Sequence, residues 1–231
     1  MWRSQKGCKS LIPPKIGRDL PKKLLERAVF WYTYTMIIPD GELRAKREEL
    51  SFQLDVPELK EVLSEVNPPM NFLVFGLGND SVFWNEVNKG GRTVFLEDIA
   101  GWFENVKKKH PELEAYLVHY DTVLSDWESL IDNQHKLKMN DIPAELRAVE
   151  WDVILVDGPM QYKPDKPGRM KSIYEASRLI KPGGHVFVHD AHSDTNTAYS
   201  RKYLLRENFV RRVSGFSILN HYHIQQVLKH K

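Results

Sequence analysis

The feature that most constrains this chain is an apolar run entering a glycine turn, followed by a second apolar run that ends in an acid. Residues 71–81 read NFLVFGLGNDS and residues 93–98 read TVFLED. Gly76 and Gly78 let the backbone turn tightly and approach a ligand. Glu97 ends the second run, where a carboxylate can accept hydrogen bonds from ribose hydroxyls. The pattern predicts a nucleotide-binding βαβ unit.

The residues after the turn indicate which nucleotide it binds. Gly78 is followed by Asn79, Asp80 and Ser81, so the third glycine of the dinucleotide fingerprint is missing. A pyrophosphate needs that glycine and a free helix N-terminus. S-adenosylmethionine carries a sulfonium and an amino-acid group but no phosphate, so it suits an acidic, polar turn. We predict this cofactor, with a nicotinamide oxidoreductase as the weaker alternative, and expect Asp80 or Ser81 to cap the next helix.

Composition narrows the class of protein. The chain has 231 residues, is 42% apolar, and carries a formal net charge of +2 with its basic residues spread among acids. These values favour one α/β domain and give no argument for nucleic acid. The single cysteine, Cys8, excludes an internal disulfide and a cysteine metal cluster. We find no run long enough to span a membrane and no signal peptide. We therefore expect a cytoplasmic protein, with a Golgi-lumenal fragment of an anchored protein as the alternative.

The chain divides into an extension and a core. Residues 1–70 are expected to form an N-terminal arm and helices that pack on the core, and residues 71–231 the core itself, in a single domain overall. The extension is predicted to contain an extended arm (1–21), an aromatic helix (22–36) and two further helices (41–53 and 57–66).

Strands and helices alternate through the core. Near-continuous apolar strands between helices indicate a buried parallel sheet. Two final strands with no helix between them predict an antiparallel hairpin. The expected strands are 72–77, 93–97, 115–120, 152–156, 185–189, 210–216 and 222–227, and the expected helices are 80–88, 99–109, 168–180 and 197–205; residues 126–137 are ambiguous and 139–149 form a loop. This is the plan of an α/β, Rossmann-like, class I S-adenosylmethionine-dependent methyltransferase fold, with a central, mostly parallel sheet.

Polar side chains gather at the predicted carboxyl ends of the strands, where open α/β sheets bind their ligands. Glu97 would hold the ribose, with Asp98 and Ile99 near the adenine, and Tyr120, Asp121 and Thr122 would flank it from the third strand. Asp157 and Asp190, at the tips of the fourth and fifth strands, would face the transferring methyl group. The predicted cofactor-binding residues are Gly76, Gly78, Asp80, Ser81, Glu97, Asp98, Tyr120, Thr122 and Asp157.

The same tips carry the predicted catalytic groups. A sugar hydroxyl is a poor nucleophile at neutral pH, so it needs a proton acceptor or a metal ion. Asp157 and Asp190 could act as base or bind a divalent cation together, and His189 could accept the proton directly. The alternative is structural: Asp157 caps the turn before Pro159, and His189 is a packed, hydrogen-bonded residue.

The loop that follows Asp157, and the start of the next predicted helix, carry residues that can contact the methyl acceptor. Tyr162 can stack on a sugar face, and Arg169 can bind a carboxylate through two hydrogen bonds. A uronic acid would suit this pair, and His192 is a third predicted substrate-binding residue. His221 and His223 alternate on a predicted edge strand, where they would contact substrate or merely occupy the sheet face.

In their order along the chain, FLVFGLGNDSVFW, TVFLED, VHYDT, WDVILVDGPMQY, PGRM and HVFVHD resemble the glucuronoxylan 4-O-methyltransferase family. The resemblance covers roughly residues 71–224. It implies S-adenosylmethionine as donor, methylation of O4 of glucuronic acid in polysaccharides of the xylan or arabinogalactan type, and a divalent metal ion as a further cofactor candidate. It does not imply an oligomeric state.

Two other functions compete with this one. One keeps the cofactor but transfers the methyl group to a small-molecule sugar or a catechol, with Asp157 and Asp190 holding a metal ion. The other is a non-catalytic partner in polysaccharide synthesis.

Overall fold

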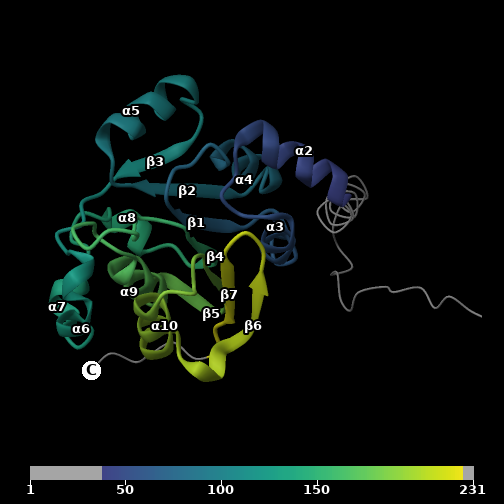
Figure 1. Cartoon of the computed structure of the whole chain (residues 1–231). Helices are drawn as coiled ribbons and strands as arrows, with labels where there is room; N and C mark the ends of the chain where they lie inside the picture. The colour runs from purple at the N-terminus through teal and green to yellow at the C-terminus, as the bar shows by residue number, and fades with distance from the viewer. Residues whose placement is uncertain (1–37, 226–231) are drawn as a thin grey trace, which may run out of the picture.

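A single seven-stranded sheet forms the centre of the protein. The computed structural model describes residues 38–225, and its strands lie in the order β3-β2-β1-β4-β5-β7-β6 (Figure 1). β1 to β5 pair in parallel, and β7 runs antiparallel to both β5 and β6. The predicted class I methyltransferase fold, including the closing antiparallel hairpin, is confirmed. The strands are β1 (Asn71–Phe75), β2 (Arg92–Glu97), β3 (Glu114–Leu117), β4 (Trp151–Val156), β5 (Ile180–Val188), β6 (Phe209–Ser214) and β7 (Ile218–His223).

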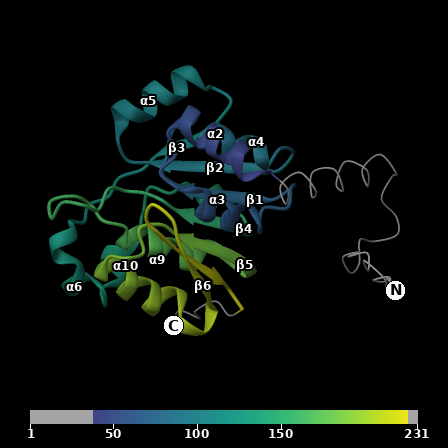
Figure 2. The same cartoon turned by 45° about the vertical axis from the view of Figure 1, so that its right-hand side comes forward.

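Helices cover both faces of this sheet (Figures 1 and 2). One face carries α2 (Asp40–Leu50), α3 (Val56–Leu63), α4 (Ser81–Val87) and α5 (Ala100–Lys109). The other carries α6 (Trp127–Leu130), α7 (Gln134–Leu137), α8 (Ala144–Arg147), α9 (Met170–Leu179) and α10 (Asp194–Tyr199). Short turns of other helix types are η1 (Leu124–Asp126), η2 (Ser200–Leu204) and η3 (Arg206–Asn208).

The apolar character of the central strands follows from this layering. In β1, Leu73 and Phe75 enter one core, whereas Phe72 and Val74 enter the other. Successive residues of a strand point to opposite faces, so a strand covered on both sides must be apolar at every position. The carboxyl ends of β1, β2, β4 and β5 consequently meet at one edge, where the chain turns into polar loops.

The described part of the extension belongs to the same core. α3 begins with a capping box, in which Glu58 Oε2 accepts a hydrogen bond of 2.7 Å from the Asp55 N–H. Leu59 and Val62 of α3 are fully buried in the core that also contains Phe187 of β5. The predicted arm (1–21) and aromatic helix (22–36) lie outside the described residues. None of the described helices is both long enough and apolar enough to cross a bilayer.

Three strands differ from the prediction, and β3 ends at Leu117 rather than at residue 120. β5 begins at Ile180 rather than at residue 185, because residues 181–184 bulge out of the ladder between the pairs Trp151–Ile180 and Val153–His185. β7 begins at Ile218 rather than at residue 222. Its middle contains two buried polar residues, Asn220 and His221, of which His221 contacts Glu61 of α3. Its sequence therefore does not look like that of a strand.

Residues 126–137, which the sequence left ambiguous, fold into short helices, and residues 139–149, predicted as a loop, contain the short helix α8. One buried carboxylate holds the second of these segments. Glu175 of α9 is fully buried. It accepts hydrogen bonds from the Met139 N–H at 2.6 Å and from Arg147 Nη1 of α8 at 2.9 Å. The ion pair therefore fastens this segment to α9, and through α9 to the sheet.

We expect Arg147→Ala to lower the free energy of unfolding by about 3–5 kcal/mol, because it leaves the buried Glu175 carboxylate without its ion-pair partner. Arg178→Ala is the matched control: Arg178 is exposed and only approaches the Tyr174 ring, at 5.6 Å, so we expect a loss below about 1 kcal/mol. Urea denaturation of both variants measures the difference. Equal losses would contradict the role given to the pair.

Candidate active site

A cavity of about 390 Å³ lies beyond the carboxyl ends of β1, β2, β4 and β5. Its walls come from the loops that follow these strands and from the segment between α2 and α3. Those loops contribute most of the predicted site residues, because parallel strands bring their carboxyl ends to one edge. The predicted residues that line it are Gly76, Gly78, Asp80, Glu97, Asp98, Asp157, Tyr162, Arg169 and Asp190.

Glu97 is fixed at the tip of β2 by backbone groups. Its Oε1 accepts hydrogen bonds from the Asp98 and Ile99 N–H groups at 3.0 and 2.8 Å, and its Oε2 accepts one from the Leu77 N–H at 3.0 Å. The side chain is 7% exposed, and burial raises its pKa. A carboxylate has about four acceptor positions, so Glu97 keeps capacity for a ligand hydroxyl while it joins the tips of β1 and β2.

The glycine turn after β1 forms the floor of the cavity beside Glu97. Gly76 has a φ of 120°, which favours glycine. A Cβ at Gly78 would lie 2.4 Å from Asp80 Oδ1, so a larger residue would displace that carboxylate. The turn therefore brings backbone and one acid close to the cavity without a side chain between them.

Asp80 is a buried acid rather than a helix cap. Its Oδ2 accepts a hydrogen bond of 2.8 Å from Trp84 Nε1, and its side chain makes no capping bond to α4. Ser81 does not cap either: it is 1% exposed, and its hydroxyl has no partner among the described residues. The capping expectation was wrong because Asp80 bonds Trp84 instead. Burial, and then the charge of Asp157, raise the pKa of Asp80 to about 6.

Tyr120 and Thr122 do not line the cavity, contrary to the sequence prediction. The Tyr120 hydroxyl lies 2.9 Å from Ser172 Oγ of α9, and burial raises its pKa. Thr122 Oγ1 donates to the Pro167 carbonyl at 3.4 Å. β3 ends at Leu117, and the chain that follows brings Tyr120 to α9 and Thr122 to the loop before that helix. Trp102 of α5, which the sequence analysis missed, lines the cavity instead and donates from Nε1 to the Leu77 carbonyl.

The tips of β4 and β5 meet at a buried arginine. Arg169, 3% exposed, approaches Asp157 Oδ1 at 3.3 Å and Asp190 Oδ2 at 2.8 Å. Its guanidinium also donates to the carbonyls of Pro159, His189 and Asp157, at 3.4, 2.5 and 2.9 Å. Its role as a ligand for a substrate carboxylate stays a prediction, and the described contacts give it a positioning role.

His189 stands behind the two acids. It is 2% exposed, and its Nδ1 lies 2.7 Å from Asp157 Oδ1. Although burial favours its neutral form, the hydrogen bond and charge of Asp157 raise its pKa. On its other side, Nε2 faces Glu58 Oε1 of α3 at 3.6 Å, and neither atom has a hydrogen-bond partner in residues 38–225. Glu58 is fully buried, and burial raises its pKa.

Asp190 and Asp157 differ in their remaining contacts. Asp190 Oδ1 accepts a hydrogen bond of 2.6 Å from Ser217 Oγ, so both of its oxygens are engaged. Although burial alone would raise it, the charges of Arg169 and His189 hold the pKa of Asp190 below its usual value. Asp157 Oδ2 makes no hydrogen bond or ion pair in the described part of the chain. Asp157 thus faces the cavity with one carboxylate oxygen available.

Exposed aromatic side chains stand at the rim. Tyr162 is 73% exposed and lines the cavity. Phe216, in the β6–β7 turn, is 82% exposed, and the neighbouring Ser217 bonds Asp190. His192 is exposed and lies 3.4 Å from Ser217 Oγ, outside the cavity lining. The sequence did not predict Phe216 or Glu58 near the site. The one signal at Glu58 is its capping-box spacing from Asp55, and that pattern indicates only the start of a helix.

Comparison with known proteins assigns the family. A family model described as IRX15/IRX15L/GXM matches residues 54–136 and 133–222. Among curated proteins of Arabidopsis thaliana, the chain is 33% identical to Glucuronoxylan 4-O-methyltransferase 1 over 85% of its length, 36% to Protein IRX15-LIKE over 80%, and 38% to Arabinogalactan O-methyltransferase 2 over 75%. It spans 72%, 66% and 66% of these relatives.

Two of these three relatives are named as O-methyltransferases, and the strand order is that of methyltransferases, so the predicted enzyme class is confirmed. The two family-model matches together reach from residue 54 to residue 222. This chain belongs to the IRX15/IRX15L/GXM family, the family that its ordered motifs predicted.

Proposed function

We propose that this chain transfers a methyl group from S-adenosylmethionine to O4 of glucuronic acid residues in a polysaccharide such as glucuronoxylan. The observation that carries the proposal is Glu97, a buried carboxylate fixed by backbone N–H groups at the tip of β2 and open to the cavity. The names of the relatives support the acceptor.

The charge of the cavity suits this donor. Asp80, Glu97, Asp98 and Asp157 line it. Carboxylates attract the sulfonium and ammonium groups of S-adenosylmethionine and repel the phosphates of a dinucleotide. Glu97 would accept from the ribose hydroxyls, and Trp102 offers an aromatic face for the adenine. When bound, the cofactor supplies an electrophilic methyl group.

Asp157 is the general base in this proposal. As the acceptor oxygen bonds to the methyl carbon and the carbon–sulfur bond breaks, the O4 proton passes to Asp157 Oδ2. Arg169 and His189 hold the other oxygen of this carboxylate, at 3.3 and 2.7 Å. His189 itself is behind Asp157 and does not line the cavity, so it acts as a positioning residue rather than as the direct base considered from the sequence.

The predicted metal site at Asp157 and Asp190 does not fit the described geometry. Asp157, His189 and Asp190 do cluster, but the guanidinium of Arg169 already lies against both carboxylates. A divalent cation would have to displace an arginine that is 3% exposed and bonded to backbone carbonyls. The positive charge at this point thus comes from the chain itself.

The rim suits an extended acceptor. Tyr162 presents an exposed ring in the cavity wall, and Phe216 presents another in the turn whose Ser217 bonds Asp190. Aromatic rings can pack on the apolar faces of sugars. A chain of sugars could cross such an open rim, whereas a small molecule would gain little from it. This observation favours a polymer over a free sugar or a catechol.

We expect Glu97→Gln to weaken binding of S-adenosylhomocysteine about 10- to 100-fold, because charge-assisted hydrogen bonds contribute about 1.5–3 kcal/mol. Isothermal titration calorimetry measures the change. Glu104→Gln, on the exposed side of α5, should bind like the wild type. If wild-type protein shows no affinity for S-adenosylhomocysteine, or Glu97→Gln binds it equally well, the cofactor site is not here.

Asp80 should make donor binding depend on pH. Its pKa is raised to about 6, so the carboxyl group is neutral at pH 5 and charged at pH 7. We expect the affinity for S-adenosylmethionine to rise several-fold over this interval, because only the charged form attracts the cationic donor. Asp80→Asn should remove this rise. A pH profile that is unchanged in the variant would contradict the assignment.

Asp157→Asn should reduce kcat by about 10²- to 10⁴-fold, the usual contribution of general-base catalysis. The affinity for S-adenosylhomocysteine should change little, and Asp165→Asn, an exposed acid in the same loop, should retain full activity. Transfer of labelled methyl groups to glucuronoxylan, arabinogalactan and free glucuronic acid measures all three proteins.

Comparing acceptors in this assay also tests the two alternative functions. Label on glucuronoxylan is the expected result. Label on free sugars or catechols alone would favour the small-molecule enzyme, and donor binding without label on any uronic-acid glycan would favour a non-catalytic partner. A fully active Asp157→Asn variant would place the base elsewhere.

A further inference from the structure

A second group of ionisable side chains lies on the face of the sheet that α3 covers. We call it the His–Glu cluster; it consists of Glu61, Glu65, His185 and His221. His221 of β7 stands opposite Phe187 in the β5–β7 ladder, and His185 lies two residues before Phe187. Glu61 belongs to α3, and Glu65 follows its end. Neither histidine lines the active-site cavity.

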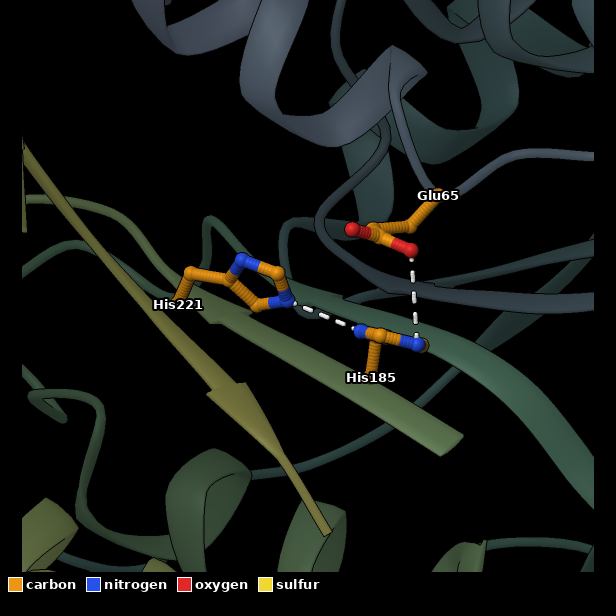
Figure 3. Close-up of side chains that lie close together, drawn as sticks. All are labelled: Glu65, His185 and His221. Carbon is orange, nitrogen blue, oxygen red and sulfur yellow. Dashed lines mark hydrogen bonds and ion pairs between the residues drawn. The ribbon is translucent and has the colours of Figure 1, made fainter. Parts of the chain in front are cut away.

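The four side chains form a chain of close contacts. Glu61 Oε1 lies 2.6 Å from His221 Nδ1, His221 Nε2 lies 2.8 Å from His185 Nδ1, and His185 Nε2 lies 3.4 Å from Glu65 Oε2. Figure 3 shows the last two of these contacts, with His185 between Glu65 and His221. His221 is 1% exposed and Glu61 7%.

The contacts need more protons than the side chains carry. Each of the three contacts requires one proton between its two atoms, but two neutral imidazoles have only two, and the carboxylates have none. An imidazolium would supply the third. With both imidazoles neutral, one of the three contacts brings two lone pairs face to face.

The net charge of the His–Glu cluster also favours a bound cation. Glu61 and Glu65 bring two negative charges, and Arg211, whose Nε lies 2.7 Å from Glu61 Oε1, compensates one. Around neutral imidazoles, one negative charge remains at a site that is partly withdrawn from water. A cation would remove both the excess charge and the lone-pair conflict.

The arrangement is that of a transition-metal site. One ligand atom from each of Glu65, His185 and His221 lies within 4.8 Å of the other two. Two neutral imidazoles and a carboxylate are zinc ligands. Glu61 completes the pattern: a carboxylate that accepts from Nδ1 of a histidine fixes the tautomer and leaves Nε2 free to bind a metal.

We propose that Glu65, His185 and His221 bind a divalent transition-metal ion of the Zn²⁺ class, with Glu61 orienting His221. The ion joins α3 to β5 and β7. The same helix carries Glu58, which faces His189 at 3.6 Å. The metal therefore stabilises the wall behind the catalytic acids and takes no part in the methyl transfer.

The test uses the full chain, stripped with a chelator and then titrated with Zn²⁺. We expect one equivalent of zinc to remain after dialysis, measured by mass spectrometry of the metal, and the melting temperature to rise by about 5–10 °C at a hundredfold excess over Kd. X-ray absorption should show nitrogen and oxygen ligands. These readouts do not depend on methyl transfer, so they stand apart from the proposed activity.

Two variants make the test specific. Glu65→Gln and His185→Gln should lose the retained zinc and the rise in melting temperature; Glu65 is 28% exposed in its side chain, so its replacement leaves the core intact. His135→Gln, an exposed histidine on α7, should behave as the wild type. No retained zinc in the wild type, an equal rise in Glu65→Gln and His185→Gln, or loss of zinc only in Asp190→Asn would each overturn the proposal.

Discussion

The candidate site depends on one buried guanidinium. Arg169, at the start of α9, contacts the side chains of Asp157 and Asp190 and the carbonyls of Asp157, Pro159 and His189. Without a cation between them, the two acids at the tips of β4 and β5 would repel each other in a poorly hydrated place. The arginine thus allows both carboxylates to stay charged and fixes the loops that carry them. Removing it would leave buried acids unpaired, which costs more than the loss of the ion pair itself.

The described part of the extension, residues 38–70, contributes to the site. α3 brings Glu58 to the back of His189, and the segment between α2 and α3 places Ser51 and Gln53 in the cavity wall. The capping box at Asp55 and Glu58 explains how one residue serves two purposes: Oε2 of Glu58 closes the helix start, whereas Oε1 points to the histidine. The position of α3 on β5 and β7 therefore affects the chemistry through His189.

The sequence predicted the fold, and the position of Glu97 in the cavity wall, because both depend on local patterns. Apolar strands with polar ends, and an acid after the second strand, place Glu97 by topology alone. It could not predict contacts set by packing. Because β3 ends at Leu117, Tyr120 and Thr122 contact α9 and the loop before it instead of lining the cavity. Arg169, predicted to bind a substrate carboxylate, contacts two acids of the chain itself. β7 was placed four residues late, since Asn220 and His221 are polar although both are buried, and the partner of His221, Glu61, comes from the distant helix α3.

The two halves of the cavity use charge differently, and the proposed donor and acceptor sides follow this difference. On the donor side, Glu97 is held by backbone N–H groups, which fix a carboxylate without cancelling its formal charge, so the wall stays negative for a cationic ligand. On the acceptor side, Arg169 and His189 balance Asp157 and Asp190. The second oxygen of Asp190 accepts a hydrogen bond from Ser217. Of these two acids, only Asp157 therefore combines a compensated charge with an available oxygen. In the proposed reaction the base needs a free oxygen to accept the O4 proton, and Asp157 offers one.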